Sequence, residues 1–434
     1  MAITIQQKPY SFTKCSQALI YRATSTNVVN DGFRFVFKIY EDTTLIATLK
    51  IAPTPEVTPQ GLLNLSPIIR NRIESKIDLT NVDLTTNWGN QNYPAYLYKI
   101  EVIEGWLVSG VFTEQAASTI TEYHYFFKGM YAVSDGFKPS MSRYQMTSDL
   151  SLLMGGRKIG THKPSVVFPS TNLNKSIYIP IRRNNLDMGY LYMLNDRTDT
   201  FTDKDSGLDS AYLAKMTLID SAGASHTASA GIGTIGSNAG IVAIPAYPAS
   251  LIGTTDFLDV ADYPNYKYYM FEILNLAGTE ERSVPYIFYP VDTDCKFDNV
   301  RLCWYNEYEG GWDYFNFEKR NEKTINVERK RIKRVVGNYA TSADGFNFDG
   351  SERGMMEGMV DVSTTISIST NVLSEGEFLL LSSLIQSKDV YILPDASTIP
   401  IPVVVESNSY TERKLRDGKV YDLNLTIRQS NEYQ

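Results

Sequence analysis

Hydrophobic residues alternate with polar ones in many short segments of the chain, beginning at residues 33–39. There, every second residue is phenylalanine or isoleucine. A period of two is typical of a strand that buries one face. The polar run at 41–44 predicts a turn, and the apolar residues after it predict a returning strand. We therefore expect a hairpin over 33–51.

The same alternation recurs along the chain and predicts a mainly β protein. Two further hairpins are expected, at 176–194 with its turn at Asn184-Asn185, and at 266–290. Other segments with a strand pattern are 96–102, 122–130, 301–317, 364–370, 390–393, 402–406 and 420–427. The fold class we expect is several β-sandwich or barrel-like units with a few short helices.

Two helices interrupt the strand pattern. Ser66 followed by Pro67 matches an N-cap with proline at the first helical position, and the isoleucines that follow predict a helix over 67–77. Nearer the C-terminus, Ser374 and Glu377 have the spacing of a capping box. The apolar stripe of this second helix is formed by Phe378, Leu381, Leu384 and Ile385.

A chain of 434 residues is too long for one hydrophobic core, so two to four domains are expected. The predicted units are an N-terminal β-sandwich-like domain at 1–135, a linker at 136–165, a central β domain at 166–337 and a C-terminal β domain at 338–434. Within the central domain, residues 221–253 are rich in Gly, Ala and Ser and cannot build a core alone. We expect them to form a long loop or arm.

The chain is acidic, with a formal net charge of −8 and a pI near 5.2. Nucleic-acid-binding proteins need a basic excess, so wholesale nucleic-acid binding is not expected. The opening residues have no basic region followed by an apolar one, so we expect no secretory signal. The weakly polar stretch 239–253 is too short to span a bilayer, and we expect a soluble protein. Cys15, Cys295 and Cys303 are expected to be reduced thiols, with a Cys295–Cys303 pair as the alternative.

No group of residues predicts catalysis, a cofactor or a metal. The glycines of 231–236 match the spacing of a dinucleotide-binding loop, but prolines follow where its helix would have to begin. His124, His162 and His226 are isolated, which argues against a zinc site. The carboxylates of 196–209 lack the spacing of an EF-hand, so a solvated loop is favoured over a calcium site. We expect a protein that is not an enzyme.

One segment of this acidic chain is strongly basic. The run 328–334 contains the cationic residues Arg329, Lys330, Arg331, Lys333 and Arg334. Charged residues often protect the edges of β-sheets, so a solvated edge strand is one interpretation. A patch that contacts an acidic partner surface, or DNA passing through a lumen, is the other. The sequence leaves both open.

Tyrosine is the most distinctive component of the chain, with 29 residues beside 19 Phe and 4 Trp. Aromatic residues suit half-buried strands, and most are expected to fill sandwich cores and rims. Tyrosine also suits contacts that are apolar on one side and wet on the other. Some aromatic faces are therefore candidates for contact with partners.

The segment 301–317 resembles part of a known group of proteins. It runs from an apolar strand through Trp304-Tyr305-Asn306 and Gly310-Gly311 to the alternating aromatics Trp312, Tyr314, Phe315 and Phe317. It is similar to the tail and neck ring (adaptor) structural proteins of crAss-like and related tailed bacteriophages of Bacteroidetes. The basic run, the C-terminal capped helix with residues 386–392, and the N-terminal segment 33–77 are further points of similarity.

This resemblance implies a β-sandwich protomer, without enzymatic activity, that closes into a 6- or 12-fold ring in the tail, neck or baseplate of a virion. The implied partners are further copies of the chain as a homo-oligomer, other tail or neck structural proteins, and DNA passing through the lumen. No membrane is implied. The protein would be made in the host cytoplasm before it joins the virion.

Two segments are expected to reach neighbouring copies, the proline-rich loop at 53–61 and the segment 221–253. Two other classes of function remain open. One is a receptor- or carbohydrate-binding module with exposed Trp and Tyr, and the other is a glycan-active enzyme with paired carboxylates. The candidate interface residues are Pro53, Pro55, Pro59, Trp304, Trp312, Tyr314, Phe317, Arg329, Lys330, Arg331, Lys333 and Arg334.

Overall fold

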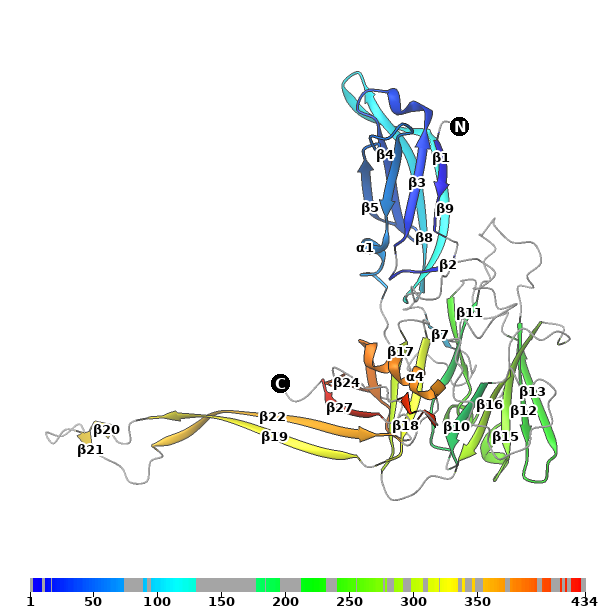
Figure 1. Ribbon diagram of the computed structural model, residues 1–434, viewed down its shortest axis with the longest axis vertical. Coiled ribbons are helices and arrows are strands. Elements are labelled where there is room, and N and C mark those ends of the chain that lie inside the picture. The colour runs from blue at the N-terminus through cyan, green and yellow to red at the C-terminus, as the bar shows by residue number, and fades with distance from the viewer. Residues whose placement is uncertain are drawn as a thin grey trace.

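The structure, a computed structural model, is mainly β and contains several antiparallel sheets with only short helices, as predicted (Figure 1). No helix in the part of the chain that the structure describes is long and apolar enough to cross a membrane. The described residues are 3–9, 12–16, 18–73, 89–91, 95–129, 177–183, 185–195, 212–231, 240–254, 256–275, 278, 285–291, 298–306, 311–319, 321–334, 338–339, 346–347, 354–370, 375–395, 400–406, 414–415, 418–419 and 423–430.

The N-terminal unit is a sandwich of two sheets. Its smaller sheet has the order β1 (Ile3–Gln7), β3 (Ile20–Ser25), β6 (Gln60–Asn64). Its larger sheet has the order β2 (Phe12–Lys14), β9 (Val111–Phe127), β8 (Ala95–Val108), β4 (Arg34–Glu41), β5 (Thr44–Ile51). A 3-10 turn, η1 (Thr26–Val29), follows β3.

The predicted N-terminal hairpin is confirmed, because β4 and β5 pair antiparallel around a turn at Asp42. The apolar residues at every second position are buried, as the alternation predicted. Phe33, Phe35, Phe37 and Ile39 are all buried in the sandwich core. The strands predicted at 96–102 and 122–130 belong to one long antiparallel hairpin of β8 and β9.

The predicted Ser-Pro helix is shorter than expected and begins differently. Helix α1 spans Ser66–Ile69, and only a turn continues it, while residues 74–77 lie outside the described part of the chain. Ser66 is the first helical residue rather than the N-cap. Its hydroxyl donates to the carbonyl of Cys15 at 2.8 Å, so this side chain is occupied by a contact that is distant in sequence.

The central unit contains two sheets. The three-stranded sheet has the order β11 (Tyr190–Asn195), β14 (Gly240–Pro245), β7 (Gly89–Gln91), so a segment from between α1 and β8 pairs here. A 3-10 turn, η6 (Val260–Asp262), also belongs to this unit. The five-stranded sheet has the order β10 (Ile177–Arg182), β16 (Tyr286–Val291), β15 (Tyr268–Asn275), β12 (Tyr212–Ile219), β13 (Ser225–Gly231).

The hairpin predicted at 176–194 is wrong, whereas the one at 266–290 is confirmed by the antiparallel pair of β15 and β16. Strand β10 pairs parallel with β16, while β11 pairs antiparallel with β14 in the other sheet. The chain passes from one sheet to the other between these strands. The alternation was identified correctly, but alternation does not specify which strands pair.

The prediction of a long loop or arm at 221–253 is also wrong. This segment supplies strands β13 and β14 and the short helix α3 (Pro248–Leu251). Ile244, Tyr247 and Leu251 are buried in the central core. Neighbouring strands supply the apolar bulk that the small residues lack, so the segment forms part of a shared core.

The C-terminal unit is one seven-stranded sheet on which helix α4 (Glu375–Gln386) packs. Leu381 and Leu384 of the predicted stripe are buried against it, whereas Ser374 of the capping box lies outside the described residues. Two separate two-stranded pairs also belong to this part of the chain, β20 (Asn338–Tyr339) with β21 (Phe346–Asn347) and β25 (Lys414–Leu415) with β26 (Gly418–Lys419). The sheet order is β18 (Gly311–Phe317), β17 (Val300–Asn306), β23 (Val390–Ile392), β24 (Ile401–Val405), β27 (Asn424–Gln429), β22 (Met355–Ser369), β19 (Glu322–Lys333).

The predicted domain boundary at 337/338 is therefore wrong, because this sheet already begins at Val300. The predicted linker at 136–165 lies outside the described residues. The strand–turn–strand unit predicted at 301–317 is confirmed as the antiparallel pair of β17 and β18.

Candidate functional site

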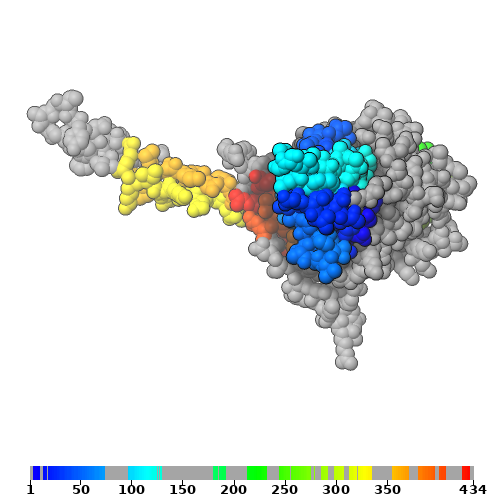
Figure 2. Space-filling model, turned by 90° about the horizontal axis from the view of Figure 1, so that it is seen from above, coloured from blue at the N-terminus to red at the C-terminus, as the bar shows by residue number. Residues whose placement is uncertain are grey.

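The most exposed element of the described structure is a two-stranded projection of the C-terminal sheet. Strand β22 pairs with β27 only over 365–369, so residues 355–364 of β22 pair with β19 alone. We call residues 325–333 of β19 and 355–364 of β22 the arm. It extends well beyond the body of the molecule (Figures 1 and 2). Nine residues of strand are about 30 Å long.

The arm carries aliphatic and methionine side chains that are open to solvent. Single exposed hydrophobic residues are ordinary on protein surfaces, but a contiguous group marks a contact surface. The described arm residues with large exposed hydrophobic side chains are Ile325, Val327, Ile332, Met355, Met356, Met359, Val360 and Val362, whose exposed fractions are between 41 and 60%.

The basic run, for which an edge strand and a contact patch were both left open, lies on β19 of this arm as far as Lys333, and Arg334 follows it. All of its side chains from Arg329 to Arg334 are exposed. Arg329 forms an ion pair of 2.6 Å with Glu357 on the opposite strand. An exposed pair of this kind adds little stability, so the structural role of the run is small. The run is placed where it can meet another molecule.

The aromatic interface candidates have a different location. Trp304, Trp312, Tyr314 and Phe317 are buried inside the chain, with exposed fractions of 0, 1, 7 and 1%. Hairpin β17–β18 is covered on both faces. Leu302, Trp304 and Phe317 contact the core beneath α4, while Cys303, Tyr305, Trp312 and Tyr314 belong to the central core. These four candidates hold two cores together and have almost no surface to offer a partner.

The proline-rich loop follows β5 at the far end of the N-terminal sandwich (Figure 1). Pro55 is exposed, whereas Pro53 and Pro59 are half-buried. Because Thr24 pairs with Gln60, the loop lies beside η1 at this end. Three exposed valines occupy the loop, η1 and the β8–β9 turn, namely Val57, Val29 and Val111. This end is a second, smaller apolar surface.

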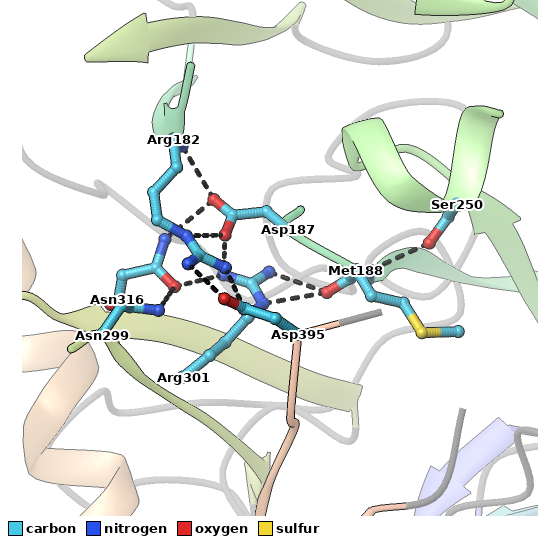
Figure 3. Close-up of polar contacts among 9 residues, drawn as sticks. Arg182, Asp187, Met188, Ser250, Asn299, Arg301, Asn316 and Asp395 are labelled. Atoms are coloured by element: carbon cyan, nitrogen blue, oxygen red, sulfur yellow. Dashed lines mark hydrogen bonds and ion pairs between the residues drawn. The ribbon is translucent and has the colours of Figure 1, made fainter. Parts of the chain in front are cut away.

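A buried polar cluster joins the central unit to the C-terminal sheet (Figure 3). Asp187, in the connection between β10 and β11, accepts from the backbone N–H of Arg182 at 2.9 Å and from its Nε at 2.6 Å. The same guanidinium makes a two-pronged contact with Asp395, at 2.6 and 3.1 Å. Asn316 on β18 donates to Asp187 at 2.8 Å.

Arg301 of β17 is the second cation of this cluster. Its guanidinium donates twice to the carbonyl of Met188, at 2.8 and 3.0 Å, and once to Asn316 at 2.9 Å. Its guanidinium carbon also lies 4.7 Å from the ring centroid of Tyr247 and 5.3 Å from that of Tyr314. Since every charge in the cluster has a charged or hydrogen-bonding partner, the arrangement is suited to fixing strands in place.

The electrostatics of Asp187 agree with a structural role. Burial by itself would raise the pKa of this carboxyl, but the charges of Arg301 and Arg182 and the hydrogen bonds from Arg182 hold the pKa below its usual range. A carboxylate held in its charged form by two arginines is a poor general acid or base near neutral pH.

The other predicted chemical candidates are dispersed. His124 is buried, accepts or donates a short hydrogen bond with Tyr21, and stacks on Phe126. His226 lies on β13 beside Asp220, at 3.0 Å. His162, the carboxylates of 196–209 and most of 231–236 lie outside the described residues. Among the residues that are described, no group of three or more His, Cys, Asp or Glu could hold a metal ion.

Sequence reasoning missed the Arg182–Asp187 cluster because both residues were assigned to a hairpin. The available signal was a carboxylate five residues after an arginine that ends an otherwise apolar strand. A scan against protein-family models found no matching family, and a search of curated proteins found no match.

Proposed function

We propose that this chain is a non-enzymatic structural protein that assembles with itself, as a ring or adaptor layer in the tail, neck or baseplate of a tailed bacteriophage. The observation that carries self-assembly is the arm, which has aliphatic side chains on two paired strands and is not covered by any described part of its own chain (Figure 2). The virion location rests on the sequence resemblance alone.

The rest of the described chain supports a structural role. Three sheet-based units are linked by buried contacts rather than by loops alone. For example, the Tyr305 hydroxyl donates to the carbonyl of Lys128 at 2.6 Å and joins the C-terminal sheet to the end of β9. Described units that are joined in this way and carry a projecting arm are suited to making repeated contacts with identical neighbours.

A receptor- or carbohydrate-binding module is not favoured by the described surface. That function would use exposed tryptophan, but Trp304 and Trp312 are buried. Trp106 is half-buried and packs against Phe33.

Electron microscopy of the purified full chain tests the proposal. We expect two-dimensional class averages with rotational symmetry, and a mass in solution that is a multiple of the 48.9 kDa chain. A protein that remains monomeric in analytical ultracentrifugation at high concentration would contradict it.

A further inference from the structure

The register of the arm assigns its side chains to two faces. Cross-strand partners in an antiparallel pair lie on the same face of the ribbon. Val327 is paired with Val362, and Val360 with Arg329. Ile325, two residues before Val327, lies on the same face. These four aliphatic residues, Ile325, Val327, Val360 and Val362, form what we call the valine face, with exposed fractions of 46 to 60%.

The valine face is extended by positive charge toward the tip of the arm. Arg329, Arg331 and Lys333 follow Val327 at every second position of β19 and so lie on the same side of the strand. On the partner strand a register shift at Gly358 places Glu357 opposite Arg331. One side of the ribbon thus presents an aliphatic patch followed by cations.

The opposite face is polar at the same height. Asn326 is paired with Ser363, and Glu328 with Asp361. At the same positions along the ribbon, one face therefore carries aliphatic side chains and the other carries polar ones. Toward the tip the opposite face carries Ile332, Met356 and Met359, but over 325–328 of β19 the aliphatic residues lie on the valine face alone.

The arm gains no cover from the described part of its own chain. A two-stranded ribbon is marginally stable in water unless a further layer packs on it. The arm projects away from the body in both views of the molecule (Figures 1 and 2). None of the described residues of the same chain buries the valine face, which is therefore open to contact with another molecule.

The distribution of charge indicates which molecule contacts the valine face. Residues 322–364 contain seven cationic and seven anionic side chains, so the remainder of the chain carries the whole net charge of −8. The four cations of the arm all lie at 329–333, and Arg334 follows them. A second copy of the chain therefore offers an acidic body to this cluster of cations, and complementary charge favours such a contact. Duplex DNA would also attract the cations, but it would leave the aliphatic patch beside them without an apolar partner.

We propose that the arm docks through its valine face and the adjacent cations on the body of a second copy of this chain. The proposal rests on the self-assembly proposed above and names the element that carries it. Each copy gives one arm and receives another, so the contact is heterologous. A heterologous contact that closes on itself produces a ring.

Two double variants test this docking. Val327→Glu with Val362→Glu places two carboxylates on the valine face, and Asn326→Glu with Ser363→Glu places the same charges at the same height on the opposite face. Since the valine positions are half-exposed, we expect both variants to keep the unfolding midpoint of the wild type. The valine-face variant should raise the apparent dissociation constant of the oligomer by at least about 100-fold in analytical ultracentrifugation, and the control should leave it within about threefold.

A photo-crosslinking amino acid at Ile325 identifies what the arm contacts. We expect mass spectrometry of the assembled protein to find cross-links from residue 325 to residues of another copy outside 322–369. Cross-links that join arm to arm would overturn the heterologous contact. Binding of duplex DNA that requires Arg329 and Arg331, with assembly unchanged in the valine-face variant, would overturn the proposal in favour of a nucleic-acid contact.

These outcomes separate the two proposals. A wild-type chain that stays monomeric contradicts both self-assembly and arm docking. If the wild type forms an oligomer and the valine-face variant assembles as well as the control variant does, arm docking alone is contradicted. Self-assembly then uses another surface.

Discussion

The Nε of Arg182 donates to Oδ1 of Asp187 at 2.6 Å, with the two side chains almost fully buried. The two residues are only five positions apart, yet they end one strand and begin the passage to another sheet. Their contact fixes the point at which the chain leaves the five-stranded sheet. Asn316 donates to Asp187 and Arg182 donates to Asp395, so the same point of the chain is also held against the C-terminal sheet.

Asp187→Ala is expected to destabilise the protein strongly. It leaves the buried guanidinium of Arg182 with only the half-exposed Asp395 as a carboxylate partner. Removing one partner of a buried pair typically costs about 3–5 kcal/mol. Asp395→Ala is the matched control, because its carboxylate is 45% exposed and water can replace it, so we expect a loss of about 1 kcal/mol. Urea unfolding followed by tryptophan fluorescence measures both, and equal losses would contradict the burial argument.

The same carboxyl is expected to make stability depend on pH in the acid range. Its pKa is lowered in the folded state despite burial, because Arg301 and Arg182 favour the charged form. The stabilisation is therefore complete above the unfolded-state pKa of about 4 and is lost as the pH decreases through the lower folded-state value. The difference in unfolding free energy between wild type and Asp187→Asn should shrink between pH 5 and pH 2. A difference that stays constant over that range would contradict this assignment.

The elements that the sequence predicted well are those fixed by local pattern. Strands β4 and β5 are adjacent in the chain and joined by a short polar turn, so their pairing needs no distant information. Strands β10 and β11 have an equally clear pattern but different partners. Their pairing depends on β16 and β14, about 50 to 110 residues away, and no local pattern encodes that.

The sequence placed the candidate site less well, for a similar reason. An edge strand was one of two interpretations of the basic run, and β19 is the edge of its sheet. The run projects from the body because β27 pairs with β22 only over 365–369. The basic residues themselves do not indicate where that pairing ends. The aromatics of β17 and β18 were interpreted as surface. Apolar residues at consecutive positions, as in Leu302 to Tyr305, indicate instead a strand covered on both faces.

Gly61→Ala is expected to destabilise the N-terminal sandwich by about 1–3 kcal/mol, because overpacking a rigid core is costly. A β-carbon at Gly61 would lie 2.5 to 3.0 Å from atoms of Phe35, which is fully buried and cannot move aside. Gly231→Ala is the matched control in another strand, since a β-carbon there meets nothing within 4 Å. Thermal unfolding of the two variants should show a lower midpoint for the first only. A lowered midpoint in both would contradict the packing argument.

Cys15 and Cys303 are expected to resist alkylation in the folded protein. Neither thiol belongs to a disulfide or has exposed surface, and burial raises the pKa of the Cys303 thiol well above its usual value. The thiolate is the reactive form, so the two effects act in the same direction. Mass spectrometry after iodoacetamide treatment should find both residues unmodified under native conditions and modified in urea. Rapid native labelling of Cys303 would contradict its burial in the central core.

Trp312→Ala distinguishes a core residue from a contact residue. Trp312 lies edge-to-face against Tyr305 and is 1% exposed, so its removal should leave a cavity and cost about 3–5 kcal/mol. Trp312→Phe keeps most of the volume and should cost about 1 kcal/mol. Tyr123→Ala, at a site that is 39% exposed, should change stability by less than about 0.5 kcal/mol. Denaturant unfolding gives the three values, and ultracentrifugation of the folded fraction gives the association. If Trp312→Ala kept wild-type stability but weakened association, the side chain would act at an interface after all.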